Sequence, residues 1–147
     1  LDDAVRDADR LLAAGYEKAG NWDLGQCCHH LADWVAFPMD GFPPTPLALR
    51  PVLWLMRNTV VPRMLRQTLD TGVMGAGTPT IPQTVHPPGR DTAAAVGRFR
   101  DAAARFAGFA GPLYPSPLAG PLDKPTAMRL HAVHAAHHLS FLVPKGG

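Results

Sequence analysis

Apolar residues recur every three or four positions in four parts of the chain, which is the spacing of one face of an α-helix. Near the start, Leu1, Val5 and Leu11 are separated by acidic and basic residues, and Gly15 follows. This pattern predicts a helix over residues 1–15. The same reasoning predicts further helices over residues 23–37, 92–110 and 125–143.

Capping residues and prolines delimit these helices. Asn21 or Asp23 supplies an N-cap for the second helix, and Asp91 supplies one for the third. Pro38 predicts the end of the second helix, and Pro125 is favoured in the first turn of the last. No segment shows the alternation of a β-strand, so the sequence predicts an all-α fold.

The connection between the second and third of these helices is long. Residues 51–69 have a helical composition, but Pro62 predicts a kink or two short helices there. From Thr71 to Arg90, glycine and proline are too frequent for a helix. We therefore predict an antiparallel four-helix bundle with a long crossover and an inserted helical segment, as a single domain over residues 1–147.

Composition and charge narrow the function classes. Hydrophobic residues make up 46% of the chain and charged residues 18%, which is enough apolar side chain for a core and excludes a disordered chain. A net charge of +2 is too small to favour nucleic acid as a partner. No apolar run is long enough for a transmembrane segment. Adjacent Cys27 and Cys28 exclude a disulfide-rich secreted domain, favour a cytoplasmic location and are expected to be core residues.

Histidine is the most informative residue type, because six of seven histidines lie in two predicted helices: His29, His30, His131, His134, His137 and His138. His134 and His138, four residues apart, project from one face, and His131 shares it. His30 is the inward candidate on the second helix. One inward histidine and a His-x-x-x-His pair supply three nitrogen ligands for Zn, Ni, Cu or Fe with open positions left over.

Other readings of these residues stay open. Histidines satisfied by hydrogen bonds in a core or cleft are the alternative to a metal site. Gln26 and Asp33 lie one turn either side of His30 and are candidates to orient its imidazole, with an ordinary position on the helix surface as the alternative. His131 is either an alternative ligand or a residue that supports the ligands from outside.

The inserted segment is basic. No acidic residue occurs between Asp40 and Asp70, whereas the segment contains four arginines, Arg50, Arg57, Arg63 and Arg66, among apolar residues. Three interpretations of such a segment stay open. It binds a substrate carboxylate, it contacts a membrane surface, or it is an amphipathic flap that packs on its own bundle. From the bundle class and the apolar insert we also predict a homodimer.

Five short motifs span nearly the whole chain: NWDLGQ at 21–26, HLA at 30–32, DGFP at 40–43, RLHAVH at 129–134 and HLSFL at 138–142. Together they resemble an uncharacterised DinB-like branch of the DinB/YfiT superfamily of metal-binding four-helix bundles. The resemblance implies a divalent metal (Zn, Ni or Fe) on His30, His134 and His138. It further implies an enzyme that acts on a small-molecule substrate, either as a metal-dependent hydrolase or as a transferase that uses a low-molecular-weight thiol. The alternative is a non-catalytic bundle that binds a metal or ligand.

Overall fold

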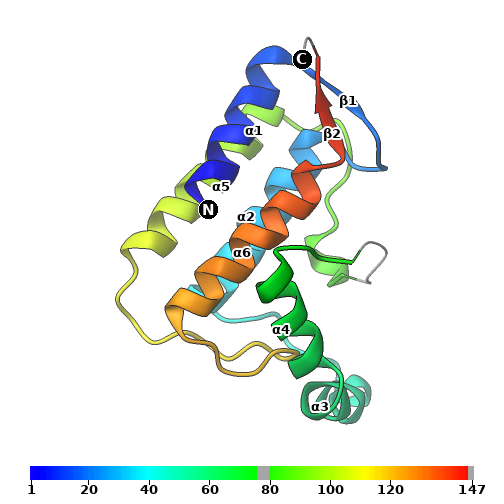
Figure 1. Cartoon of the computed structure of the whole chain (residues 1–147), viewed down its shortest axis with the longest axis vertical. Helices are drawn as coiled ribbons and strands as arrows, with labels where there is room; N and C mark the ends of the chain where they lie inside the picture. Colours follow the sequence, from blue (N-terminus) through cyan, green and yellow to red (C-terminus); the bar gives the residue numbers. More distant parts are fainter. Residues whose placement is uncertain (76–79, 146–147) are drawn as a thin grey trace.

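The computed structural model describes residues 1–75 and 80–145, and these residues are mostly helical (Figure 1). The predicted all-α class is therefore confirmed in its main feature. The α-helices are α1 (Asp2–Ala14), α2 (Leu24–Asp40), α3 (Arg50–Asn58), α4 (Val61–Thr71), α5 (Thr92–Gly108) and α6 (Lys124–Leu139). Two short 3₁₀ helices, η1 (Leu47–Leu49) and η2 (Pro82–Thr84), and two short strands, β1 (Tyr16–Lys18) and β2 (Leu142–Pro144), complete the described elements.

The core lies between the four longest helices, α1, α2, α5 and α6, which run side by side in Figure 1. From the sequence we expect Ala95, Val96, Phe99, Ala103, Phe106 and Ala110 to form the core face of α5, and all but Ala110 are buried. The face ends at Phe106, because α5 stops at Gly108 and Ala110 is exposed. Burial of the two phenylalanines, both fully enclosed, supplies a large share of the hydrophobic stabilisation.

Helices α2 and α5 run in the same direction, which three contacts along their length establish. Asp23 at the start of α2 accepts from the backbone N–H of Gly89 just before α5, at 3.0 Å. Further along, Arg98 pairs with Asp33, and at the C-terminal ends Arg105 forms an ion pair with Asp40. The crossover over residues 41–91 returns the chain to the starting end, so this neighbouring pair is parallel, unlike the antiparallel arrangement that we expected.

Both predicted caps form, and a third that was not predicted, Asp123, caps α6. Asp23, rather than Asn21, caps α2: it accepts from the Gln26 N–H at 2.7 Å, and the Gln26 side chain accepts from the Asp23 N–H at 3.1 Å. This reciprocal capping box satisfies two N–H groups that a helix start leaves free. Asp91 caps α5 and Asp123 caps α6 by the same kind of side-chain acceptance.

Two helix ends differ from the prediction. Pro38 lies inside α2, which continues to Asp40, because Pro38 and Met39 are buried and the Gly41 N–H still donates to Phe37 at 2.8 Å. The burial of Pro38 thus outweighs the usual effect of proline as a helix terminator. At the other end of the chain, α6 stops at Leu139 rather than near residue 143.

A small antiparallel sheet, which the sequence did not predict, explains the early end of α6. Strand β2 pairs with β1 in the register Tyr16↔Pro144 and Lys18↔Leu142. This pairing draws the backbone out of the helix just after Leu139 and buries Leu142 in the core. Strands of three residues carry too little periodicity to be recognised from a sequence. The sheet connects the end of α1 to the end of α6.

The inserted segment forms two helices, as Pro62 predicted. Helix α3 ends at Asn58, and α4 begins at Val61 with Pro62 in its first turn. Helix α4 packs on α6 and buries Val61 and Thr68, whereas α3 buries no residue. Among the residues that the structure describes, no helix is long and apolar enough to cross a membrane.

Candidate metal centre

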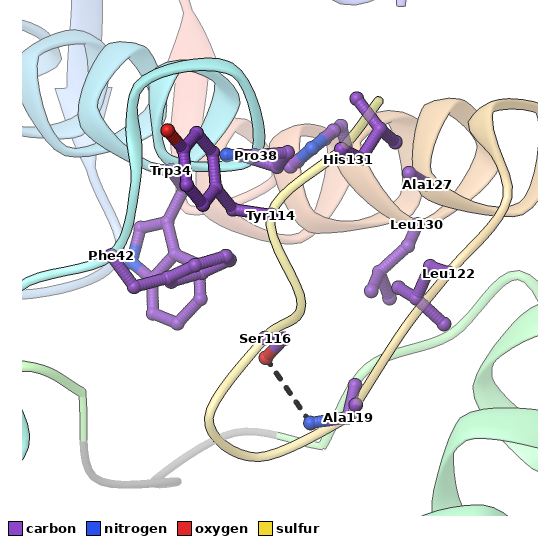
Figure 2. A pocket seen from close by; sticks show the side chains of 12 residues that line it. Trp34, Pro38, Phe42, Tyr114, Ser116, Ala119, Leu122, Ala127, Leu130 and His131 are labelled. Atoms are coloured by element: carbon purple, nitrogen blue, oxygen red, sulfur yellow. Dashed lines mark hydrogen bonds between the residues drawn. The ribbon is translucent and has the colours of Figure 1, made fainter. Parts of the chain in front are cut away.

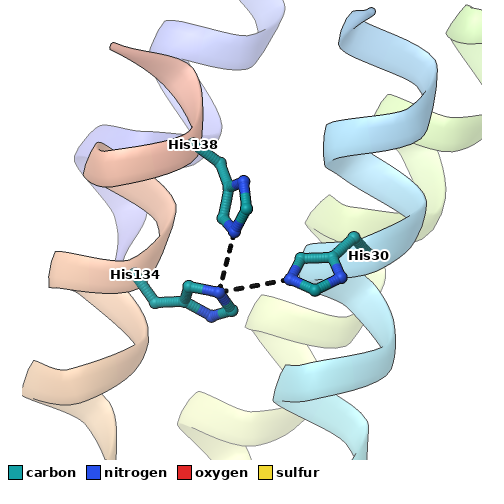
Figure 3. Close-up of side chains that lie close together, drawn as sticks. All are labelled: His30, His134 and His138. Carbon is teal, nitrogen blue, oxygen red and sulfur yellow. Dashed lines mark hydrogen bonds between the residues drawn. The ribbon is translucent and has the colours of Figure 1, made fainter. Parts of the chain in front are cut away.

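Three imidazole rings converge between α2 and α6 (Figure 3). His30 comes from the middle of α2, while His134 and His138 come from successive turns of α6. The Nε2 atom of His134 lies 3.2 Å from Nε2 of His30 and 3.0 Å from Nε2 of His138. Packing of α2 against α6 therefore brings together the three residues that the resemblance implied, whereas spacing along the chain had left His131 open as well.

Two of the three separations between these nitrogens fit coordination of one ion. Imidazole nitrogens bind zinc at about 2.0–2.1 Å, so two ligands on one ion lie about 2.9 Å apart at right angles and about 3.4 Å apart in a tetrahedron. The two measured separations, 3.0 and 3.2 Å, fall in this range. One ligand atom from each of the three residues lies within 4.8 Å of the others.

The tautomer of His30 is set by Thr84 in η2. His30 Nδ1 lies 3.2 Å from the Thr84 carbonyl oxygen, which only accepts hydrogen bonds. It also lies 3.0 Å from the Thr84 hydroxyl, whose proton is donated to the carbonyl of Ile81 at 2.8 Å. His30 Nδ1 must therefore carry the proton, and Nε2 presents its lone pair to His134 and His138.

Hydrogen bonds among the three imidazoles cannot pair all of their Nε2 atoms. The Nε2 atom of His134 lies within hydrogen-bond distance of two other nitrogens but carries at most one proton. Because Nε2 of His30 is an acceptor, at least two of the three nitrogens direct lone pairs at the same point. A divalent cation at that point would accept all three lone pairs, so the chemistry of the donor set fits a metal.

Burial holds the three rings in the neutral form that binds metals. It lowers the pKa of His30 to about 4 and the pKa of His138 to about 3. The pKa of His134 is well below its usual value, because burial and the neighbouring His138 and His30 all disfavour its charged form. At neutral pH the site therefore needs no deprotonation before it binds an ion.

Two tryptophans form apolar walls around the imidazoles. The Trp22 ring stacks on His138 with centroids 5.2 Å apart and an interplanar angle of 7°, and its centroid lies 4.9 Å from that of His30. The Trp34 ring meets His134 edge to face at 5.6 Å. These contacts restrict the orientation of the rings and cover part of their surface, so that His30 is buried and His134 and His138 are half-buried.

Gln26 and Asp33 contact the loop after η2 rather than the His30 ring. The Gln26 side chain donates to the carbonyl of His86 at 2.8 Å. His86 Nε2 lies 2.7 Å from one carboxylate oxygen of Asp33, whose other oxygen binds Arg98. Both residues therefore hold the segment that carries Thr84, and through it they act on His30 indirectly.

His131 lies outside the cluster, one turn before His134. It is buried, its ring meets Phe106 edge to face at 5.1 Å, and Nε2 has no hydrogen-bond partner. Its ring lines a cavity of about 50 Å³ between α2, α6 and the loop before α6. Figure 2 shows Trp34 and Phe42 on one side of this cavity and Leu122 and Leu130 on the other.

The remaining candidates do not join the three imidazoles. His29 contacts the His86 ring, and His137 packs on Phe141 and on the outer side of His138. Both cysteines are free and buried, and burial raises the pKa of Cys27 to about 12, so its thiol stays protonated. A protonated thiol is a poor metal ligand, which leaves imidazole as the only ligand type in the described cluster.

Three residues of the site carried no functional signal in the sequence. Trp22 belongs to a motif that the resemblance used, but nothing in that motif showed that its ring stacks on His138. Thr84 and His86 lie in a stretch rich in glycine and proline, far along the chain from α2. Contacts between residues that are more than fifty positions apart leave no periodic pattern in the sequence, so only the folded structure shows them.

The Thr84 hydroxyl gives a first test of the site. Thr84→Val removes this oxygen but keeps the backbone carbonyl and the shape of the side chain. We expect it to weaken divalent-metal binding about tenfold, at the lower end of the usual effect of such orienting partners. Metal competition titrations would measure the change. Thr45→Val, at a half-buried position with no contact to the cluster, is the control and should bind metal like the wild type.

Comparison with known proteins places the whole chain in one family. Residues 1–145 match the model of a family described as a protein of unknown function, DUF1569. Neither the curated proteins nor the solved structures contain a match to this chain. Because the matched residues include every helix and strand described above, the chain belongs to the DUF1569 family of proteins of unknown function.

Proposed function

We propose that this protein is a metal-dependent enzyme whose divalent ion is held by His30, His134 and His138. The observation that carries the proposal is the convergence of three imidazoles, in which Nε2 of His134 lies 3.2 Å from that of His30 and 3.0 Å from that of His138. Three protein ligands leave coordination positions open, as in catalytic rather than structural sites. Hydrolysis, or transfer involving a low-molecular-weight thiol, is the reaction class that we propose.

The residues of the chain would prepare this site in distinct ways. Thr84 fixes the tautomer of His30, and the rings of Trp22 and Trp34 hold the imidazoles and cover part of their surface. When bound, a divalent ion supplies Lewis-acid chemistry that lowers the pKa of a water molecule or a thiol. The three imidazoles suit Zn, Ni or Fe.

The cavity beside the centre is the place that we propose for the apolar part of a small-molecule substrate. Trp34 lines it and also contacts the His134 ring, so the Trp34 side chain links the cavity to the imidazoles, although none of the three is among the lining residues. Its walls are mostly apolar, and His131 contributes an imidazole that has no hydrogen bond at Nε2. Such a cavity suits a short hydrocarbon group that carries one hydrogen-bonding atom.

A DinB-like bundle is the finer fold assignment that we propose. Two observations support it: four long helices with a long crossover between the second and third, and one histidine on α2 opposite a His-x-x-x-His pair on α6. The long connection carries η2, and η2 supplies Thr84 to the site. In this proposal the crossover is part of the metal centre rather than a passive link.

A non-catalytic metal-binding bundle is the second candidate, and one observation favours it. Within the described part of the chain, no carboxylate joins the three imidazoles. The nearest acidic candidate from the sequence, Asp33, has both oxygens engaged by His86 and Arg98. An acid or base for proton transfer would then have to be His131 or come from the substrate.

Metal content and its pH dependence test the proposal. Protein purified without a histidine tag should contain about one divalent ion per chain by elemental analysis. Because the pKa values of His30 and His138 lie near 4 and 3, protons compete with the ion only as the pH falls toward 4. We therefore expect occupancy to persist at pH 5.5, where an ordinary exposed histidine is already largely protonated.

The same pKa values predict a cost in stability for the metal-free protein. Unfolded histidines take up protons near pH 6.5, whereas the folded ones resist protonation until about pH 4. Acidification from pH 6.5 toward 4 therefore favours unfolding, and circular dichroism must accompany each metal measurement. Loss of the ion by pH 5.5 from protein that is still folded, or no ion at pH 7.5, would contradict the proposal.

Turnover separates the two candidates. Metal-loaded protein is to be assayed with activated esters, amides and thiol acceptors, with chelated protein and His134→Ala as controls. Turnover that disappears in both controls supports the enzyme, whereas one bound ion with no turnover across the three substrate classes favours the non-catalytic bundle.

A further inference from the structure

The inserted segment presents an apolar surface that nothing in the described chain covers. Helix α3 has no buried residue, although five consecutive residues, 52–56, are apolar. We define the α3 face by its most exposed apolar side chains, with exposed fractions between 51% and 75%: Leu47, Leu49, Val52, Trp54, Leu55 and Val60. Large apolar side chains exposed in this number within one short segment indicate an interaction surface rather than ordinary scatter.

Its neighbour α4 shows why the exposure is unusual. Both helices are strongly amphipathic in sequence, but α4 turns Val61 and Thr68 into its contact with α6. Helix α3 instead contacts α4 and η1 and projects from the end of the bundle in Figure 1. Part of α4 is therefore covered within the chain, whereas no residue of α3 is buried.

Charge around the α3 face indicates the kind of partner. Arg50, Arg57, Arg63 and Arg66 are all exposed, and none forms an ion pair within residues 1–75 and 80–145. Three arginines of α5 differ in this respect: Arg98, Arg100 and Arg105 each pair with an aspartate. Since the whole chain carries only +2, these four charges leave the rest of the chain net negative. The positive charge is thus concentrated at the apolar surface.

We propose that the α3 face docks on the surface of a lipid bilayer that contains anionic lipids. Exposed leucine and valine side chains would enter the boundary between headgroups and acyl chains, where tryptophan is also favoured. The guanidinium groups would bind the anionic headgroups. At nine residues, α3 is about 13 Å long, far short of a bilayer core, so it would lie along the surface.

A second copy of the chain fits this surface less well. In a symmetric dimer the same patch meets itself, so two α3 faces would bring their arginines together. No acidic residue lies between Asp40 and Asp70 to compensate this repulsion. The predicted homodimer, if it forms, is therefore expected to use another surface.

Vesicle flotation tests the proposal with the full chain. The protein should float with phosphatidylglycerol–phosphatidylcholine vesicles, remain unbound with pure phosphatidylcholine, and be released by 0.5 M NaCl. The double variant Arg50→Glu, Arg63→Glu should lose at least about tenfold in vesicle affinity. The matched control Arg90→Glu, Arg129→Glu makes the same change in net charge at exposed arginines outside the insert and should bind like the wild type.

The apolar contribution has its own variant and signal. Val52→Ser, Leu55→Ser changes two exposed side chains, so the bundle should fold normally by circular dichroism while flotation falls. Trp54 fluorescence should shift to the blue on vesicle binding, and the shift should vanish in Trp54→Phe. Absence of flotation with anionic vesicles, or equal binding by the Arg50→Glu, Arg63→Glu variant, would overturn the proposal.

Sedimentation distinguishes the alternative occupant. If the wild type forms a dimer that Leu55→Ser converts to monomer, and anionic vesicles do not bind it, the α3 face is an interface between copies and the lipid proposal is wrong. None of these measurements depends on the metal centre, because the α3 face shares no residue with it.

Discussion

Replacing His134 with alanine is expected to leave the purified protein with less than about one tenth of its wild-type metal content. His134 is the central ligand, because its Nε2 atom lies within 3.2 Å of both other Nε2 atoms. The two remaining nitrogens then come from different helices and cannot hold an ion as firmly. His30→Ala and His138→Ala should lose metal to a similar degree. Elemental analysis of tag-free protein, together with circular dichroism, is the measurement.

Two histidines of α6 serve as controls. His137→Ala should retain the ion, because that ring packs on Phe141 and outside the cluster. His131→Ala should also retain it, because His131 lies beside Phe106 and lines the adjoining cavity. Full loss of metal in His131→Ala, combined with full retention in His138→Ala, would show that the ligands lie one turn earlier on α6.

Replacing Phe99 with alanine is expected to lower the free energy of unfolding by about 3–5 kcal/mol. Phe99 is completely buried in the middle of α5, where it packs in the cluster formed by the four long helices. Truncation removes an aromatic ring and leaves a cavity that the surrounding helices cannot fully close. Urea unfolding of chelated protein measures the change without the added stability that a bound metal provides.

An exposed position gives the matched control for this measurement. Leu47→Ala removes a large apolar side chain that is 75% exposed, so the free energy of unfolding should change by less than about 0.5 kcal/mol. A loss below about 1 kcal/mol in Phe99→Ala would mean that α5 does not pack as described. A large loss in Leu47→Ala would mean that the α3 face is covered within the chain.

Local signals in the sequence determined most of the helices. Asp91 and Asp123 cap the starts of α5 and α6, and Pro62 separates α3 from α4, because each acts on backbone groups within a few residues. These local signals predicted the wrong helix end where contacts with distant residues outweighed the local conformational preference. Pro38 stays helical because it is buried, and α6 ends early because β2 pairs with β1.

The candidate site divides in the same way. Helical spacing placed His134 and His138 on one face and His30 on an inward edge, so the sequence identified the three residues that the structure brings together. Spacing did not separate His138 from His131, because both share the face of His134. The packing of α6 makes the choice, since it directs His131 toward Phe106 and His138 toward Trp22.

Periodicity and neighbours along the chain therefore determined the helical class, the starts of the long helices and the face of α6 that carries the histidines. Only the tertiary structure decided the parallel pairing of α2 with α5, the orientation of His30 by Thr84 and the exposure of α3. The physical reason is that each of these depends on where the long crossover returns to the bundle. That position is set by packing between residues more than fifty positions apart, and it leaves no local pattern in the sequence.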